Sequence, residues 1–213
     1  MEKIKALGVK TILHSNDSGV AEQHAQKLAK EQEKIYVSPY NDPQIIAGQG
    51  TLAIELLDQL PRLDVVYVSI GGGGLISGIG CVLKAFSPRT RVVGVSAKNS
   101  AELAASIRAG QMVKVDHLET LADGCAGGVD NDTITLGLGS EVIDDLIDCS
   151  EGQIEVGLQQ IAWNEKMLVE GSAGLAYAAW QEDASNNKNK ISAVVLCGAN
   201  FDKETLSPIF NRE

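Results

Sequence analysis

Short apolar runs rich in β-branched residues alternate with longer amphipathic segments along most of the chain. The apolar runs predict buried strands at residues 11–14, 35–38, 65–70, 91–95, 146–148 and 191–197. The segments between them predict helices at residues 19–33, 50–60, 75–86, 101–109, 151–170 and 173–184. This alternation predicts an α/β fold: a parallel sheet with helices on both faces.

Turn and capping residues divide this pattern. Pro39, Asp42 and Pro43 indicate a linker. We therefore expect a small lobe within residues 1–43 and a large lobe at residues 44–213. Thr51 is the expected cap of the helix at residues 50–60, and Ser150 with Gln153 predicts a capping box at the next long helix.

Four consecutive glycines, Gly71 to Gly74, join the strand at residues 65–70 to the helix that begins near Leu75. Glycines allow successive N–H groups to converge on one point, and the helix dipole adds positive potential there. The run therefore predicts a phosphate-binding nest, against the alternative of a flexible turn that binds nothing. No Gly-Lys-Ser/Thr follows, and Ser96 stands where a dinucleotide site needs an acid, so a small phosphorylated cofactor is favoured.

Composition narrows the class of protein. Hydrophobic residues make up 44% of 213 residues, enough for a real core, and the net charge of −10 argues against a nucleic-acid partner. No apolar run is long enough for a membrane span, and the charged start is unlike a signal peptide. The four cysteines are widely spaced, which predicts reduced thiols and a cytoplasmic location. The three histidines show no metal or triad spacing and are expected to be structural or exposed.

Six motifs together resemble one enzyme group. In order they are 39–43 (PYNDP), 47–51 (AGQGT), 71–78 (GGGGLISG), 120–124 (TLADG), 170–174 (EGSAG) and 196–200 (LCGAN). The chain resembles the serine/threonine dehydratases, which depend on pyridoxal phosphate (PLP) and share the tryptophan-synthase-β-like fold, PLP fold type II. The resemblance implies the large lobe of that fold with an incomplete small lobe, a lyase of amino-acid metabolism, and a homodimer.

The resemblance gives the motifs roles. Gly71, Gly72, Gly73, Gly74 and the N–H of Leu75 would hold the PLP phosphate, and Cys197 would contact the ring nitrogen. A thiol with an ordinary pKa of about 8.5 is mostly neutral at pH 7, which suits elimination from the β-carbon. From the sequence alone a small apolar filler at a strand end is the favoured interpretation of Cys197, and the resemblance favours the cofactor contact instead. Glu170 and Asp123 would lie near the ring. Intact relatives convert a β-hydroxy amino acid to a 2-oxo acid and ammonia, and the choice between serine, threonine and other substrates stays open.

Two parts of the family pattern are missing. Ser96 replaces the first acid of a divalent-cation site for which Glu102 matches the second, so we expect no metal site of the family type. The Ser-x-Lys-x-Arg-Gly-Ala motif, whose lysine bonds covalently to PLP and removes the Cα proton, has no match either. We therefore expect a truncated chain that lacks the amino-terminal third, has no catalytic residue of its own and binds PLP noncovalently at best.

Three interpretations remain open at this point. The first is a truncated serine/threonine dehydratase that is inactive as given. The second is a non-catalytic protein that binds PLP, phosphate or a partner and retains the back half of the fold. The third is an unrelated enzyme of a phosphorylated ligand.

Overall fold

A computed structural model describes residues 2–15 and 18–210. Contacts divide the chain into two compact units, Met1–Val37 and Ser38–Glu213. The second unit contains the sheet and all the residues to which the sequence assigns a role in binding.

The first unit carries little core of its own. It contains α1 (Glu2–Ala6) and α2 (Ser18–Glu31), and none of the side chains described for α2 is buried. Leu7 is 79% exposed and Ile35 is 91% exposed. The strand predictions at residues 11–14 and 35–38 are wrong, because both segments are irregular chain in the structure. A strand requires a hydrogen-bonded neighbour, and no strand is described within this unit.

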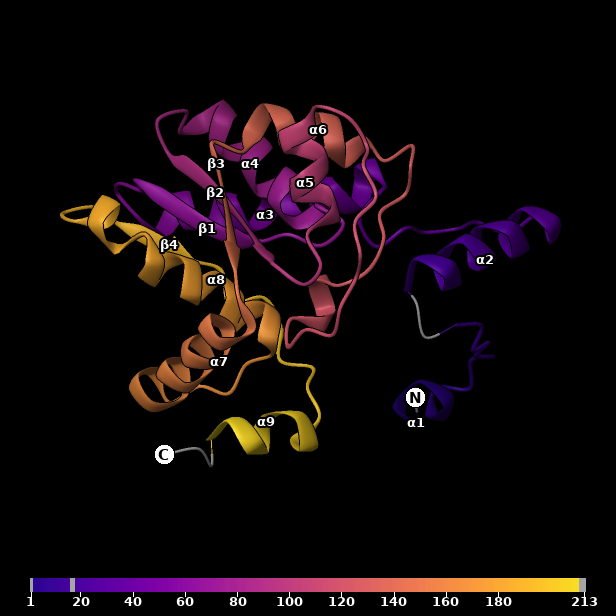
Figure 1. Ribbon diagram of the computed structural model, residues 1–213. Coiled ribbons are helices and arrows are strands. Elements are labelled where there is room, and N and C mark those ends of the chain that lie inside the picture. Colours follow the sequence, from indigo (N-terminus) through magenta and orange to yellow (C-terminus); the bar gives the residue numbers. More distant parts are fainter. Residues whose placement is uncertain (1, 16–17, 211–213) are drawn as a thin grey trace. The chain divides into compact units, whose positions relative to one another are not determined.

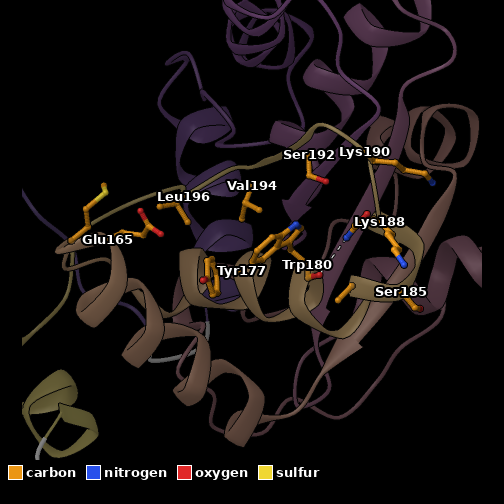
Figure 2. Close-up of a pocket in the computed structure, with 12 residues that line it drawn as sticks. Glu165, Tyr177, Trp180, Ser185, Lys188, Lys190, Ser192, Val194 and Leu196 are labelled. Atoms are coloured by element: carbon orange, nitrogen blue, oxygen red, sulfur yellow. Dashed lines mark hydrogen bonds between the residues drawn. The ribbon is translucent and has the colours of Figure 1, made fainter.

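The second unit is built on a parallel sheet, which confirms the predicted fold class. Its strands are β1 (Val65–Ser69), β2 (Arg91–Ala97), β3 (Asp145–Cys149) and β4 (Ser192–Val194), in the order β3-β2-β1-β4. Val66 pairs with Val92 and with Ala193, so β1 lies at the centre. Helices cover both faces (Figure 1). Strand β4 is at one edge, beside Tyr177 and Trp180 of α8 (Gly171–Glu182) (Figure 2).

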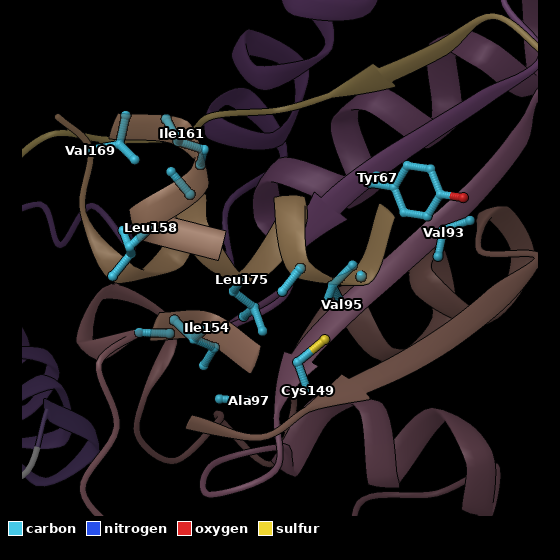
Figure 3. Close-up of a cluster of buried hydrophobic side chains, with 14 of the residues drawn as sticks. Tyr67, Val93, Val95, Ala97, Cys149, Ile154, Leu158, Ile161, Val169 and Leu175 are labelled. Carbon is cyan, nitrogen blue, oxygen red and sulfur yellow. The ribbon is translucent and has the colours of Figure 1, made fainter. Parts of the chain in front are cut away.

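Alternate residues of the strands enter two separate cores. Val66, Val68 and Val92 face one core, with side chains of α3 (Pro43–Gln59), α4 (Gly74–Phe86), α5 (Glu102–Ala109) and α6 (Ile134–Val142). Val65 and Val93 face the other, with side chains of α7 (Glu151–Gln160), α8 and α9 (Lys203–Phe210) (Figure 3). This alternation places every strand between two apolar layers, as is usual for parallel sheets. Short 3₁₀ turns occur at Asp123–Cys125 and Ala184–Asn187.

Capping side chains set two helix starts. Asp42 caps α3, accepting hydrogen bonds from the N–H groups of Gln44 and Ile45, and Pro43 occupies the first turn. The prediction that Thr51 is the cap is therefore wrong: Thr51 lies inside α3 and its hydroxyl donates to the carbonyl of Gly48. The capping box of Ser150 and Gln153 is confirmed at the start of α7.

The predicted helix at residues 151–170 ends earlier than expected. After Gln160 the chain forms a π-helical turn, Ile161–Glu165, and Lys166 follows in the left-handed region with φ +58°. A non-glycine residue in this region ends the helical hydrogen-bond pattern. The turn therefore separates α7 from the segment that leads to Glu170 and α8.

A charged network closes the amino end of the sheet. The Tyr67 hydroxyl lies 2.6 Å from Asp183 Oδ2, and the Arg91 guanidinium bonds to Asp183 and to Asp145. Burial raises the pKa of Asp183, but the hydrogen bonds from Tyr67, Arg91 and Asn186 outweigh burial and hold the pKa below its ordinary value of 3.8. Arg91 and Asp145 are the first residues of their strands, so the network lies toward the end of the sheet opposite the glycine run.

Candidate functional site

The glycine run lies at the carboxyl end of β1. Gly73 is the N-cap of α4 and has φ +85°, a left-handed conformation that favours glycine. Within the described chain no side chain caps this helix, so the first N–H groups of α4 keep their hydrogen-bonding capacity. These N–H groups lie together at the positive end of the helix dipole. This arrangement suits a phosphate or another small anion.

Neighbouring segments enclose the glycine run tightly. A Cβ at Gly72 would lie 2.3 Å from Tyr40 Cγ, and a Cβ at Gly71 would lie 2.9 Å from Cys125 Cα. The Thr135 hydroxyl donates to the carbonyl of Gly72 at 2.7 Å. Because the C=O and N–H of one peptide point in opposite directions, this bond directs the N–H of Gly73 away from Thr135. The glycines are therefore required by close packing as well as by backbone conformation.

Tyr40 is a wall of the site that the sequence did not reveal. Its ring packs over the glycine run, and its hydroxyl accepts a hydrogen bond from the N–H of Asp130 at 2.9 Å. The motif at residues 39–43 is the available signal: the sequence indicates a linker there and includes the segment among the six family motifs, but it gives Tyr40 no role of its own. The ring also connects the glycine run to the loop that contains Val129 and Asp130.

Cys197 follows β4 and lies near the end of β1. The Ser69 side chain, two residues before Gly71, interacts with the thiol, and β4 pairs with β1, so the structure places Cys197 and the glycine run at neighbouring strand ends. Burial raises the pKa of the Cys197 thiol, Glu170 raises it further, and the Ser69 contact offsets only part of the shift. The thiol is therefore protonated and neutral at pH 7.

Glu170 holds the segment after Cys197. Its Oε2 accepts a hydrogen bond from the N–H of Asn200 at 2.9 Å, and its own N–H donates to the carbonyl of Gly198 at 3.3 Å. The Ser69 hydroxyl donates to the carbonyl of Ser172 at 2.6 Å, joining β1 to α8. Asp123 begins a 3₁₀ turn that packs against Glu170, since a Cβ at Gly124 would lie 2.9 Å from Glu170 Oε1. These contacts bring together the motifs at residues 120–124, 170–174 and 196–200 at the carboxyl edge of the sheet.

A buried carboxylate anchors the loop behind the glycine run. The Glu102 side chain is 1% exposed; Oε1 lies 2.9 Å from Lys114 Nζ and accepts the N–H of Val129, while Oε2 lies 3.1 Å from His117 Nε2. His117 Nδ1 in turn lies 2.8 Å from the Ser100 hydroxyl. Burial raises the pKa of Glu102, but the bonds from Val129, Lys114 and His117 outweigh burial and lower the pKa below 4.5.

Glu102 is also the second acid of the divalent-cation site that the family resemblance describes, so its hydrogen-bond partners matter for that site. Both oxygens of Glu102 are directed to protein donors, and Ser96 is buried on β2. Across the described residues, no group of three or more His, Cys, Asp or Glu side chains is placed to hold a metal ion.

The sequence is similar to one protein family and to several curated proteins. The profile of the family described as "pyridoxal-phosphate dependent enzyme" matches residues 1–198. The chain belongs to this family. It is 33% identical over 210 residues to an L-threonine ammonia-lyase of Thermotoga maritima, covering 99% of this chain and 52% of that protein. It is 32% identical over 200 residues to the catabolic L-threonine dehydratase TdcB of Escherichia coli K12, covering 93% of this chain and 60% of that protein.

Solved structures of related enzymes also match this chain. The processed form of threonine deaminase isoform 2 from Solanum lycopersicum matches with a TM-score of 0.88 and 28% identity, covering 98% of this chain and 61% of that one. Maize serine racemase matches with a TM-score of 0.85 and 27% identity, covering 97% and 64%. The chain therefore has the PLP fold type II architecture and spans about half the length of the curated relatives it matches. In the described part of the chain, no helix has the length and apolar character needed to cross a membrane.

Proposed function

We propose that this chain is the cofactor-phosphate half of a PLP-dependent serine/threonine dehydratase. Gly71 to Gly74 and the N–H of Leu75 bind the phosphate, and Cys197 contacts the ring nitrogen. The observation that carries the proposal is the uncapped start of α4, where Gly73 has φ +85° and the preceding glycines pack against Tyr40 and Cys125. Membership in a PLP-dependent family supports the choice of PLP over other phosphorylated ligands.

Each group in the site has a role that suits PLP. The backbone N–H groups and the helix dipole compensate the negative charge of a phosphate. The left-handed conformation of Gly73 turns the chain so that the first residues of α4 face the phosphate. The Cys197 thiol is neutral, because burial raises its pKa, and leaves the ring nitrogen without a protonating acid. When bound, PLP withdraws electrons from the substrate Cα, and a less electrophilic ring favours loss of a β-substituent.

The chain as given lacks a base in the required context. No segment of these 213 residues matches the family's lysine motif. Lys114 is engaged by Glu102, Lys84 by Asp144, and Lys166 donates to the carbonyl of Trp163. We therefore infer that this polypeptide alone does not deaminate serine or threonine, and that the reaction in intact relatives depends on residues outside it.

PLP binding by the purified protein tests the proposal. Noncovalent binding should be seen by changes in PLP fluorescence, with no adduct in mass spectra after borohydride. Gly72→Ala should weaken binding at least tenfold, because the new Cβ meets the Tyr40 ring. Gly48→Ala is the matched control, since nothing lies within 4 Å of a Cβ at that position of α3.

Two outcomes would overturn the proposal. Equal PLP affinity in wild type and Gly72→Ala would show that the glycine run does not bind the phosphate. A stoichiometric adduct on one lysine, together with release of a 2-oxo acid from serine or threonine, would show that the chain carries its own catalytic base.

A further inference from the structure

A lysine ammonium lies against the buried carboxylate of Glu102. Lys114 Nζ is 2.9 Å from Glu102 Oε1, and it donates a second hydrogen bond, of 3.3 Å, to the carbonyl of Val129. The N–H of Val129 donates to the same Oε1 at 2.9 Å. The ammonium is therefore held between a carboxylate and a peptide carbonyl, the two kinds of oxygen ligand that hard metal cations prefer.

The fold of α5 brings Lys114 to this position. The helix begins at Glu102 and is capped by Gly110, whose left-handed conformation, with φ +68°, turns the chain back. The Ser106 hydroxyl then accepts a hydrogen bond from the N–H of Val113 at 3.0 Å. Because Ser106 follows Glu102 by four residues, the two side chains share one face of the helix. Val113 is thereby held one turn from Glu102, and the next residue, Lys114, reaches the carboxylate.

The second oxygen of Glu102 completes an anchor for the loop. Glu102 Oε2 lies 3.1 Å from His117 Nε2, and His117 Nδ1 lies 2.8 Å from the Ser100 hydroxyl. The Ser100 oxygen accepts a hydrogen bond from the N–H of Gly127 at 3.0 Å. The loop is therefore held at two nearby points, Gly127 by Ser100 and Val129 by Glu102. The Lys114 ammonium supplies a positive charge at the second of these points.

The charges of this network differ from those of the family cation site. That site has two acids, and Glu102 matches only the second of them. Ser96, at the position of the first, is buried on β2 and carries no charge. One carboxylate balances one monovalent ammonium, just as two carboxylates balance one divalent metal ion. The residues present therefore suit a lysine side chain and do not suit the metal site.

We propose that Lys114 is a tethered cation, which takes the place of a divalent metal ion at Glu102 and anchors the loop without metal. Divalent cations should then leave the wild-type protein unchanged, because the ammonium already fills the space between Glu102 and Val129. A variant without the ammonium has a carboxylate and a carbonyl oxygen available and should gain a response to divalent cations. The expectation that PLP binding is also independent of divalent cations rests on the proposed function, whereas the anchor itself requires no PLP.

Hydrogen exchange at the N–H of Val129 measures the anchor directly. Lys114→Ala should speed this exchange by up to about fivefold, which corresponds to about 1 kcal/mol, the upper limit for a pair with an exposed lysine. Ca²⁺ or Mg²⁺ at about 10 mM, well above the dissociation constants of weak extracellular sites, should return the rate to that of wild type. Sodium chloride keeps the ionic strength constant. The wild-type rate should not change with either cation or with EDTA.

Two control variants make the test specific. Lys84→Ala removes a lysine from a pair with Asp144, whose side chain is 39% exposed, and exchange at Val129 should neither speed up nor respond to Ca²⁺. Lys114→Ala combined with Glu102→Gln should lose the response to Ca²⁺, because the amide carries no charge to attract the cation. Thermal unfolding of each variant establishes that it is folded.

Three results would overturn the inference. An equal effect of Ca²⁺ on wild type and on Lys114→Ala would mean that a metal ion binds beside the lysine. Unchanged exchange in Lys114→Ala would mean that the ammonium does not anchor the loop. Faster exchange that no divalent cation reverses would mean that Lys114 forms an ion pair without standing in for a metal ion.

Titration with PLP, in the presence of Ca²⁺ and of EDTA, separates this inference from the proposed function. The expected exchange results without PLP binding would support the tethered cation and refute the cofactor role. PLP binding by wild type that depends on Ca²⁺ would refute the tethered cation and leave the proposed function intact.

Discussion

Replacing Glu102 by alanine should destabilise the second unit by about 2–4 kcal/mol, because it removes a buried acceptor and leaves its hydrogen-bond donors unsatisfied. The side chain is 1% exposed and accepts hydrogen bonds from the N–H of Val129, from Lys114 and from His117. Without it, the buried N–H of Val129 has no acceptor, which costs about 1–3 kcal/mol. The Lys114 contact adds about 1 kcal/mol or less, since that side chain is 62% exposed. Loss of the His117 bond and of side-chain packing supplies the rest.

Urea unfolding measures the free energy of unfolding, and hydrogen exchange measures how the substitution changes the loop beside the glycine run. Glu102→Ala should speed exchange of the N–H groups of Val129 and Asp130, because both residues lie in the loop that Glu102 anchors. The N–H of Val129 donates to Glu102, and the N–H of Asp130 donates to the Tyr40 hydroxyl. Glu102→Gln keeps one acceptor and should cost about half as much. Glu141→Ala, at an exposed position of α6, should change stability by less than about 0.5 kcal/mol.

The pH dependence of Glu102 has a defined sign. Its pKa in the folded protein lies below 4.5, so its stabilising contribution is fully present above about pH 4.5 and is lost as the pH falls through the folded-state pKa. The loss of stability below pH 4.5 should be less steep in Glu102→Gln than in wild type. A cost of Glu102→Ala below 1 kcal/mol, or unchanged exchange at Val129, would refute the view that this carboxylate anchors the loop.

Three further predictions concern other parts of the second unit. Gly73→Ala should lower the free energy of unfolding by about 1 kcal/mol because of the left-handed backbone, and further because Leu103 Cδ2 lies 2.3 Å from the new Cβ. In urea unfolding, Gly110→Ala should show the backbone cost alone, since Gly110 has φ +68° and nothing lies within 4 Å of its Cβ position. Tyr67→Phe should lower stability by about 1–3 kcal/mol, because Asp183 and Asn187 lose a buried partner, and calorimetry measures it. In a thiol-labelling time course at pH 8, exposed Cys81 should react first, since burial raises the pKa of Cys125 and Cys149 to about 12; equal rates would contradict the packing.

The sequence was informative where local signals agreed with the fold. The β-branched run at residues 65–70 became β1 because both of its faces are buried, and the glycines after it allow close contact with Tyr40 and Cys125. The run at residues 35–38 has similar composition but no neighbouring strand described in its unit, so it did not form a ladder. The Glu102 network joins residues 12 to 27 positions apart, and no local period reports such contacts. Only the family resemblance points to Glu102, and it implies a different role, as the second acid of a cation site.

The phosphate contacts alone limit how tightly this chain can hold PLP. If four N–H groups at the glycine run each contribute about 2 kcal/mol to a charged ligand, the gross gain is about 8 kcal/mol. The lower estimates of association entropy cost about 4 kcal/mol. The net of about 4 kcal/mol corresponds to a Kd of about 1 mM. Isothermal titration of the purified chain with PLP measures this value. A Kd below about 1 μM would require about 4 kcal/mol from contacts beyond the glycine run, with Cys197 as the first to test by Cys197→Ala. A millimolar Kd would instead indicate that the phosphate half of the site folds in place while most of the cofactor's affinity in intact relatives comes from the polypeptide that this chain does not span.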